Sequence, residues 1–278
     1  MFRVGMSSCG FGIDEESFEN LKNSGIEAIE IKTTKADELK KIKKLAERYG
    51  IDIWSSHLPF YPFECFDISE LKADIRGNIV SSHKELISQI ADMGVDKFVI
   101  HSSGEPINEK DREEKLKCAE ESLDELAGYA HACGACIAVE DLPRTCLGHD
   151  SCEIQRLIGV NDNLRVCLDT NHLLSEDIFS FMDKVGDKIV TLHISDYDMI
   201  DEKHWLPGEG NIDWVGFYNK LCSLGYNGVW MYEINPAHHP GIERERALSF
   251  YDVYKNAMTI FSGNLPEAFG MRIEVKGK

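Results

Sequence analysis

Long apolar runs are missing from this sequence of 278 residues. No stretch reaches the roughly 18 consecutive apolar residues that a membrane-spanning helix needs. The first six residues, Met-Phe-Arg-Val-Gly-Met, also lack the apolar core of a secretory signal. We therefore expect a protein without a membrane segment.

An excess of positive charge is missing as well. The chain carries 30 Lys and Arg against 48 Asp and Glu, a formal net charge of −18. Such a charge repels nucleic-acid phosphates over most of the surface and disfavours an anionic membrane. The composition therefore argues against a general nucleic-acid coating role, although it leaves room for a local basic cleft.

A cysteine framework is also absent. The nine cysteines are an odd and scattered set, and Cys133 and Cys136 form the one C-x-x-C pair. Without a second pair a structural zinc ribbon is not supported, and we expect packing rather than a redox role. Reduced thiols in a cytoplasmic protein are the simplest interpretation.

Glycine-rich nucleotide motifs are missing from the segment that follows the first apolar run. Residues 5–12 contain glycines but neither G-x-G-x-x-G nor G-x-x-x-x-G-K-[ST]. A nucleotide site is therefore not supported.

The chain does contain an alternation of short apolar runs and longer amphipathic stretches. The expected strands are 3–7, 28–32, 52–56, 97–101, 136–140, 165–169, 189–194 and 228–234. The expected helices are 14–24, 35–49, 71–93, 109–133, 152–158, 177–185, 213–224 and 241–261. Eight such units predict a single α/β domain, a (β/α)8 TIM barrel over residues 1–262; an open doubly wound sheet is the alternative. Residues 263–278 form a C-terminal tail, in which 271–275 could be an extra strand.

Polar side chains of metal-ligand type recur where the expected strands end. They are His57, His101, Glu140, Asp169, His172, His193 and Glu233. In a barrel these positions converge on the C-terminal rim, where catalytic groups lie. One such residue alone is more often structural, but seven from six consecutive strands call for another explanation. Several carboxylates buried together repel each other and lose hydration unless a cation is present.

Four of these residues form the strongest candidate for a metal site. Glu140, Asp169, His193 and Glu233 supply three carboxylates and one imidazole. This donor set suits Mn²⁺, Mg²⁺, Co²⁺ or Zn²⁺, with positions left open for water or substrate. A second polar cluster, residues 201–210, contains Glu202 and His204 and is either a specificity loop or a solvated turn.

At these positions the sequence resembles the xylose isomerase-like barrels. Asp169 and His172 match a D-x-x-H motif, His193 begins an H-x-x-D segment, and residues 204–213 match H-x-x-P-G-x-G-x-I-D. That superfamily contains sugar-phosphate isomerases and epimerases, keto-sugar 3-epimerases, hydroxypyruvate isomerase, inosose dehydratase and endonuclease IV. The resemblance implies that the four candidate ligands share one metal, that Glu140 and Glu233 exchange the substrate proton, and that His172 contacts a substrate oxygen.

The same resemblance leaves a second function open. In endonuclease IV the positions matching His57 and His101 hold an additional zinc, and those matching His172, Glu202 and His204 hold a third, with an aspartate in place of Glu202. The alternative function is therefore a zinc-dependent phosphodiesterase acting on abasic DNA. Acidic or neutral rim segments at 60–67, 104–109 and 196–202 argue against a DNA-binding surface.

A departure from the epimerases concerns the segment after His193. Many of them carry an arginine there, whereas residues 195–198 read Ser-Asp-Tyr-Asp. Arg144 and Lys203 are the nearby cations that could replace it in binding a phosphate or hydroxyl.

The expected function is a metal-dependent isomerase or epimerase in carbohydrate metabolism, acting on a small sugar or sugar phosphate through an enediolate. His57, His101, His172, Glu202 and His204 would bind substrate or a second metal, and zinc is the expected ion if the site is multinuclear. Trp54, Phe60 and Trp205 are candidates for the pocket wall. A non-enzymatic metal- or sugar-binding barrel is a third interpretation, and a homodimer is compatible with the resemblance.

Overall fold

The fold is seen in a computed structural model that describes residues 1–32, 35–237 and 241–273. Eight parallel strands adjoin in the order β7-β6-β5-β4-β3-β2-β1-β8. They are β1 (Arg3–Ser7), β2 (Ala28–Ile31), β3 (Asp52–His57), β4 (Lys97–Ile100), β5 (Cys136–Glu140), β6 (Leu164–Asp169), β7 (Ile189–His193) and β8 (Val229–Tyr232). A parallel bridge between Ile194 and Tyr232 brings β7 against β8. The predicted (β/α)8 barrel is confirmed.

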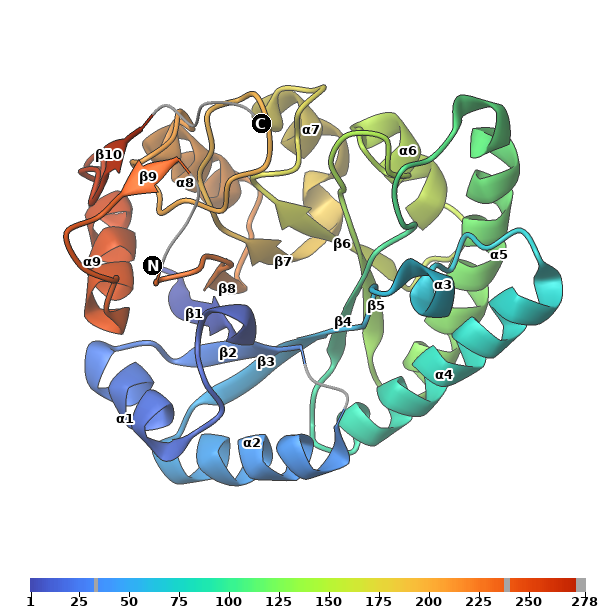
Figure 1. Ribbon diagram of the computed structural model, residues 1–278, viewed down its shortest axis with the longest axis horizontal. Helices are drawn as coiled ribbons and strands as arrows, with labels where there is room; N and C mark the ends of the chain where they lie inside the picture. The colour runs from blue at the N-terminus through green and yellow to red at the C-terminus, as the bar shows by residue number, and fades with distance from the viewer. Residues whose placement is uncertain (33–34, 238–240, 274–278) are drawn as a thin grey trace.

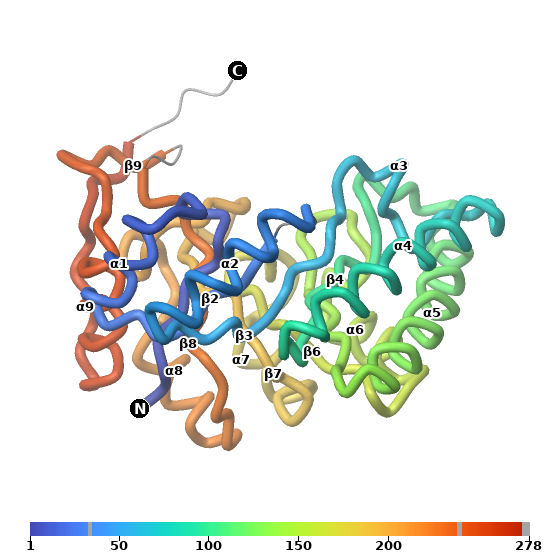
Figure 2. Tube along the Cα trace, turned by 90° about the horizontal axis from the view of Figure 1, so that it is seen from below, coloured from blue at the N-terminus to red at the C-terminus, as the bar shows by residue number. Residues whose placement is uncertain are grey.

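Helices surround these strands in an outer layer (Figure 1). They are α1 (Glu15–Ser24), α2 (Ala36–Tyr49), α4 (Ala73–Ala91), α5 (Glu109–Ala132), α6 (Ser151–Ile158), α7 (Ile178–Val185), α8 (Trp214–Ser223) and α9 (Phe250–Phe261). Single short turns add η1 (Ser8–Gly10), α3 (Phe63–Phe66) and η2 (Gly186–Lys188). Figure 2 shows α3 on the side of the barrel opposite the N-terminus, where the loops after the strands gather.

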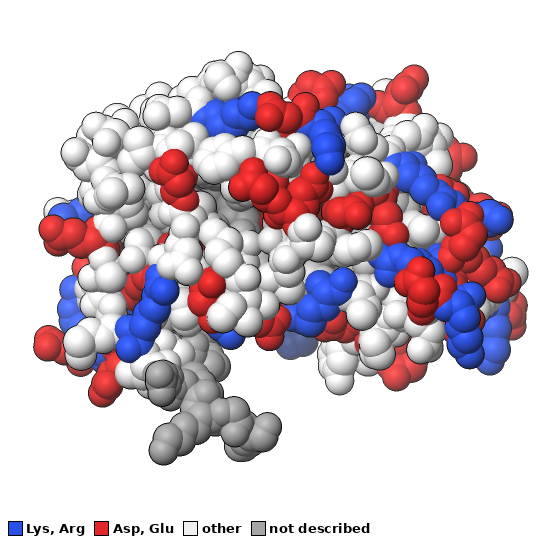
Figure 3. Space-filling view, turned by 90° about the horizontal axis from the view of Figure 1, so that it is seen from above, with Lys and Arg blue, Asp and Glu red and all other residues white. Residues whose placement is uncertain are grey.

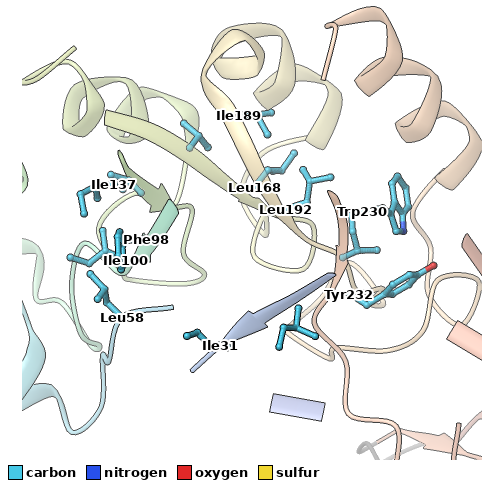
Figure 4. Packing of buried hydrophobic residues seen from close by; sticks show 14 of the residues in the cluster. Ile31, Leu58, Phe98, Ile100, Ile137, Leu168, Ile189, Leu192, Trp230 and Tyr232 are labelled. Atoms are coloured by element: carbon cyan, nitrogen blue, oxygen red, sulfur yellow. The ribbon is translucent and has the colours of Figure 1, made fainter. Parts of the chain in front are cut away.

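The two faces of each strand have different surroundings. Outward residues such as Leu168, Leu192 and Trp230 are fully buried between strands and helices (Figure 4). Inside the barrel, small clusters that include Ala138 and Cys167 fill the space. Because side chains alternate along a strand, the residues two positions further on also point inward. This alternation aims the polar residues at the strand ends into the mouth of the barrel.

The last helix begins later than expected, and the prediction of a helix from residue 241 is wrong. α9 starts at Phe250, where the side chains of Ser249 and Asp252 form a reciprocal capping box. The segment before it contains β9 (Ile242–Glu243), which pairs antiparallel with β10 (Met271–Arg272). The possible extra strand in the tail therefore exists as β10, outside the barrel sheet, while residues 274 and 275 lie outside the described residues. In the described part of the chain, no helix has the length and apolar character of a bilayer span.

One ion pair secures the loop after β5. Arg112 donates to both carboxylate oxygens of Glu153, at 2.7 Å each, and to the carbonyl oxygens of Thr145 and Cys146. Burial by itself raises the pKa of Glu153, but hydrogen bonds from His149, Arg112 and a backbone N–H lower it to about 2. The folded protein therefore favours the ionised form of Glu153 more than the unfolded chain does. The ionised carboxylate stabilises the fold fully at a pH above its unfolded pKa of about 4.3. This stabilisation is lost as the pH falls towards 2.

We expect Glu153→Gln to lower the free energy of unfolding at pH 7 by about 1–3 kcal/mol, because one partner of a partly buried pair is lost. The deficit should shrink between pH 5 and pH 2 in urea titrations. The exposed Glu47→Gln is the control and should change little at any pH. A deficit that stays constant down to pH 2 would contradict this assignment.

Candidate metal centre

The four predicted ligands meet at the mouth of the barrel. Glu140, Asp169 and His193 end β5, β6 and β7, and Glu233 directly follows β8. One donor atom from each lies within 4.8 Å of the others, and all four residues are buried. His193 Nδ1 is 2.8 Å from Glu140 Oε1, 2.8 Å from Glu233 Oε2 and 3.7 Å from Asp169 Oδ2. The side chains from four strands thus share a common centre.

The donor atoms at this centre fit a divalent cation. Asp169 Oδ1 accepts the backbone N–H of Asn171 at 2.7 Å, but the buried Oδ2 has no hydrogen-bond partner among the described residues. A buried carboxylate oxygen without a partner is costly, and a cation between the four residues would satisfy it. Three carboxylates and one imidazole suit Mn²⁺, Mg²⁺, Co²⁺ or Zn²⁺.

Two opposing effects set the pKa values of the carboxylates in this cluster: burial raises them, and neighbouring positive charges lower them. Burial raises the pKa of Asp169 to about 6, although His172 and His204 oppose the shift. Burial also acts to raise the pKa of Glu140, but the charges of His193 and His101 lower it well below its ordinary value. The carboxylates thus depend on neighbouring positive charge to remain ionised.

A second group shares Glu140 with this centre. His57 Nε2 lies 3.1 Å and His101 Nε2 3.2 Å from Glu140 Oε2. His57 Nδ1 donates to the carbonyl oxygen of Leu58 at 2.7 Å, which leaves Nε2 free to face the carboxylate. The ring of Phe60 stacks on His101 with centroids 4.0 Å apart. The structure therefore places Phe60 beside the candidate ligands.

A third group lies between the loops after β6 and β7. His204 Nε2 is 2.8 Å from Glu202 Oε1, and His172 Nε2 is 3.5 Å from the same oxygen and 3.6 Å from Asp169 Oδ2. His172 Nδ1 donates to the carbonyl oxygen of Asp141 at 2.8 Å, so its Nε2 faces the carboxylates. All five residues predicted to bind substrate or a second metal thus surround the central four.

The motif after β7 is held together by Asp196. Its carboxylate accepts the backbone N–H groups of Gly208 and Gly210 at 2.8 and 2.9 Å and the indole N–H of Trp214 at 2.8 Å. A Cβ at Gly210 would lie 2.0 Å from Asp196 Oδ1, so a larger residue cannot occupy this position. The H-x-x-D and P-G-x-G elements therefore shape one loop, which presents His204 to the mouth.

The two tryptophans predicted at the pocket wall make other contacts. Trp54 contacts Arg3 and Lys97, the first residues of β1 and β4, with Lys97 Nζ 3.7 Å from the ring centroid. It therefore lies near the strand beginnings, away from the candidate ligands. Trp205 is buried, its backbone pairs with that of Asp196, and Arg272 covers its ring. It holds the loop after β7 instead of offering an open aromatic face.

Among the described residues, sequence reasoning missed several that contact the candidate ligands, including Glu30, Lys32, Asp141 and Cys167. Glu30 on β2 faces His193 Nε2 at 3.0 and 3.1 Å, and Lys32 forms an ion pair with Glu233. Asp141 accepts the backbone N–H of Asp169 at 2.8 Å. A single glutamate within the buried strand Ala-Ile-Glu-Ile was the signal that could have indicated the first of them.

Comparison with known proteins assigns the chain to a family. The sequence model described as "Xylose isomerase-like TIM barrel" matches residues 18–251. The protein therefore belongs to the xylose isomerase-like TIM barrel family, and the resemblance found in its motifs is confirmed.

Similar proteins include several sugar epimerases. Fructoselysine 3-epimerase of Escherichia coli O157:H7 is 24% identical over 286 residues, covering 88% of this chain and 98% of that protein. D-psicose 3-epimerase of Ruminiclostridium cellulolyticum is 25% identical and covers 69% of this chain and 66% of that protein. The structure of L-ribulose 3-epimerase superimposes with a TM-score of 0.76 at 19% identity, covering 94% of each chain. A D-tagatose 3-epimerase-like protein gives a TM-score of 0.75 at 23% identity, covering 84% of this chain and 90% of the other.

The cluster predicts that a divalent cation stabilises the fold. After dialysis against a chelator, adding Mn²⁺ at 100 times its dissociation constant should raise the free energy of unfolding by about 2.7 kcal/mol. Asp169→Asn should lose most of this gain, because one ligand charge is removed. Glu120→Gln, which alters a pair with Arg156 on the outer helices, should retain it. Thermal unfolding with and without Mn²⁺, Mg²⁺, Co²⁺ and Zn²⁺ measures the effect; equal melting temperatures throughout would contradict it.

Proposed function

We propose that the protein is a metal-dependent epimerase or isomerase of a small, unphosphorylated ketose. The observation that carries the proposal is the shared centre of Glu140, Asp169, His193 and Glu233, in which two carboxylates flank one imidazole nitrogen at 2.8 Å. The similarity to fructoselysine, psicose and ribulose 3-epimerases supports a keto-sugar substrate.

The proposed reaction exchanges a proton on carbon next to a carbonyl group. A bound divalent cation would supply Lewis-acid polarisation of that carbonyl and stabilise the negative charge of an enediolate. Glu140 or Glu233 would accept the proton from carbon, and the other carboxylate would return one. Epimerisation results if the proton returns to the same carbon from the opposite face.

The neighbours of the two glutamates hold their outer oxygens. Glu140 Oε2 faces His57 and His101, whereas Glu233 Oε1 pairs with Lys32. These contacts orient each carboxylate before substrate enters, which reduces the reorganisation needed during proton transfer. His172 would bind a substrate hydroxyl, and Phe60 would exclude water from one side of the site.

The cations near the mouth support a substrate without a phosphate group. Arg144 already pairs with Glu105, Asp201 and Glu202 at 2.7, 3.0 and 2.9 Å. Lys203 Nζ lies 3.7 Å from Asp198 Oδ2. A phosphate would have to compete with these carboxylates for both side chains predicted to replace the missing arginine. A neutral sugar needs only the hydroxyl-binding groups that are present.

A hydrolytic function is the second candidate, because the groups around His57 and His172 could hold two further ions. Three clustered zinc ions would activate water and balance the charge of a phosphodiester. The side of the barrel shown in Figure 3 carries basic side chains mixed with acidic ones. A DNA backbone is bound by clustered basic side chains, and the net charge of −18 together with the pairing of Arg144 near the mouth supports a sugar substrate better.

Replacing either proposed proton-transfer residue should stop the reaction without unfolding the protein. We expect Glu140→Gln and Glu233→Gln each to lower kcat by about 10²–10⁴-fold, because an amide cannot accept the proton. The assay follows solvent deuterium entering ketoses in D₂O, with phosphorylated and unphosphorylated sugars side by side. Glu120→Gln should keep full activity. If either Gln variant remained active, the replaced glutamate would not be one of the two proton-transfer residues.

Metal counting separates the two candidate functions. We expect one tightly held divalent ion per chain in elemental analysis, together with ketose turnover and no cleavage of abasic DNA. Three zinc ions per chain with cleavage would instead establish the phosphodiesterase. Bound metal without either activity would favour a binding protein.

A further inference from the structure

Glu30 is a buried carboxylate that lies behind His193, on the side away from the other acidic residues. Both residues have no exposed surface. The Glu30 oxygens lie 3.0 and 3.1 Å from His193 Nε2, while His193 Nδ1 faces Glu140 and Glu233. The imidazole ring is therefore held between one carboxylate on its Nε2 side and the candidate ligands on its Nδ1 side.

The two strands on either side of β2 hold this carboxylate in place. Ser55 on β3 donates its hydroxyl to Glu30 Oε2 at 2.9 Å, and Ser7 on β1 donates to Oε1 at 3.4 Å. Both serines are buried. Because the Glu30 carboxylate accepts hydrogen bonds from these two hydroxyl groups, its orientation does not depend on His193. It can therefore determine the orientation of the imidazole ring.

The chemistry of imidazole makes this orientation important. A neutral imidazole carries one N–H and one lone pair, and a carboxylate can only accept a hydrogen bond from it. When a cation occupies the common centre and His193 is neutral, a hydrogen bond from Nε2–H to Glu30 leaves the lone pair on Nδ1, which faces that cation. Histidines that bind metals commonly donate their other ring N–H to a carboxylate, which fixes the tautomer and makes the ligand nitrogen more basic.

We propose that Glu30 is a positioning residue of the metal centre, which accepts the Nε2 proton of His193 and directs the Nδ1 lone pair to the ion. The inference rests on the metal centre of the proposed function but is independent of its substrate. A glutamine at this position would also present an N–H₂ group to Nε2. That contact would favour the other tautomer, with its proton on Nδ1, where the cation must bind.

The test is a titration of metal-free protein with Mn²⁺, with no sugar present. Glu30→Gln should weaken Mn²⁺ binding by about 10–100-fold, the usual cost of losing such an outer contact. Ser55→Ala, which removes one support of Glu30, should weaken binding by a smaller factor. Glu120→Gln should bind as tightly as the parent protein. Nitrogen-15 spectra of the zinc-loaded parent should show the His193 proton on Nε2, a signal that a purely structural role would not require.

The outcomes separate this inference from the proposed reaction. Unchanged Mn²⁺ affinity in Glu30→Gln, or a zinc-loaded parent with His193 coordinated through Nε2, overturns the role of Glu30. If Glu30→Gln does not fold, unchanged affinity in Ser55→Ala has the same consequence. A parent protein that binds Mn²⁺ but epimerises no ketose refutes the proposed reaction and leaves the role of Glu30 intact. A parent that binds no divalent ion overturns both.

Discussion

The mouth of the barrel is governed by the cost of burying negative charge. Glu30, Glu140, Asp169 and Glu233 lie around His193 with almost no contact with water. Such a group of carboxylates is destabilising unless positive charge lies among them. Histidines and Lys32 supply part of it. Asp169 Oδ2, which has no hydrogen-bond partner within the described part of the chain, marks where a cation would complete the balance. The buried acidic cluster is thus also a candidate set of metal ligands, already brought together in the folded protein.

The surrounding structure positions the side chains of this cluster. Strand alternation sends apolar residues outwards into the helix layer and polar strand ends inwards. Backbone contacts then orient the imidazoles, as when His57 and His172 donate to carbonyl oxygens. Asp196 gathers the loop after β7 from within, which brings His204 to the same mouth. The arrangement of the candidate ligands therefore depends also on groups that do not themselves touch the common centre.

The cluster at the barrel mouth is compatible with both candidate functions, the ketose epimerase or isomerase and the zinc-dependent phosphodiesterase. The charges around it favour the first. The groups around His57 and His172 extend the central four towards a multinuclear arrangement. However, Arg144 is occupied by three carboxylates, and the net charge of −18 opposes a polyanionic substrate. A sugar without charge meets neither obstacle. Under the proposed function, substrate selectivity would depend on the charges around the mouth as much as on the candidate ligands within it.

Local periodicity was enough to predict the strands and most helices, because alternation and amphipathic spacing are properties of neighbouring residues. It also indicated Glu140, Asp169, His193 and Glu233, since parallel strands bring their carboxyl ends to one rim. The start of α9 at Phe250 was missed, because the preceding segment pairs with β10, a distant part of the chain. Glu30 behind His193 and Trp54 near the strand beginnings were likewise decided only in the folded barrel. Which side chains meet across its interior depends on strand register and closure, and these are set by contacts between residues far apart in sequence.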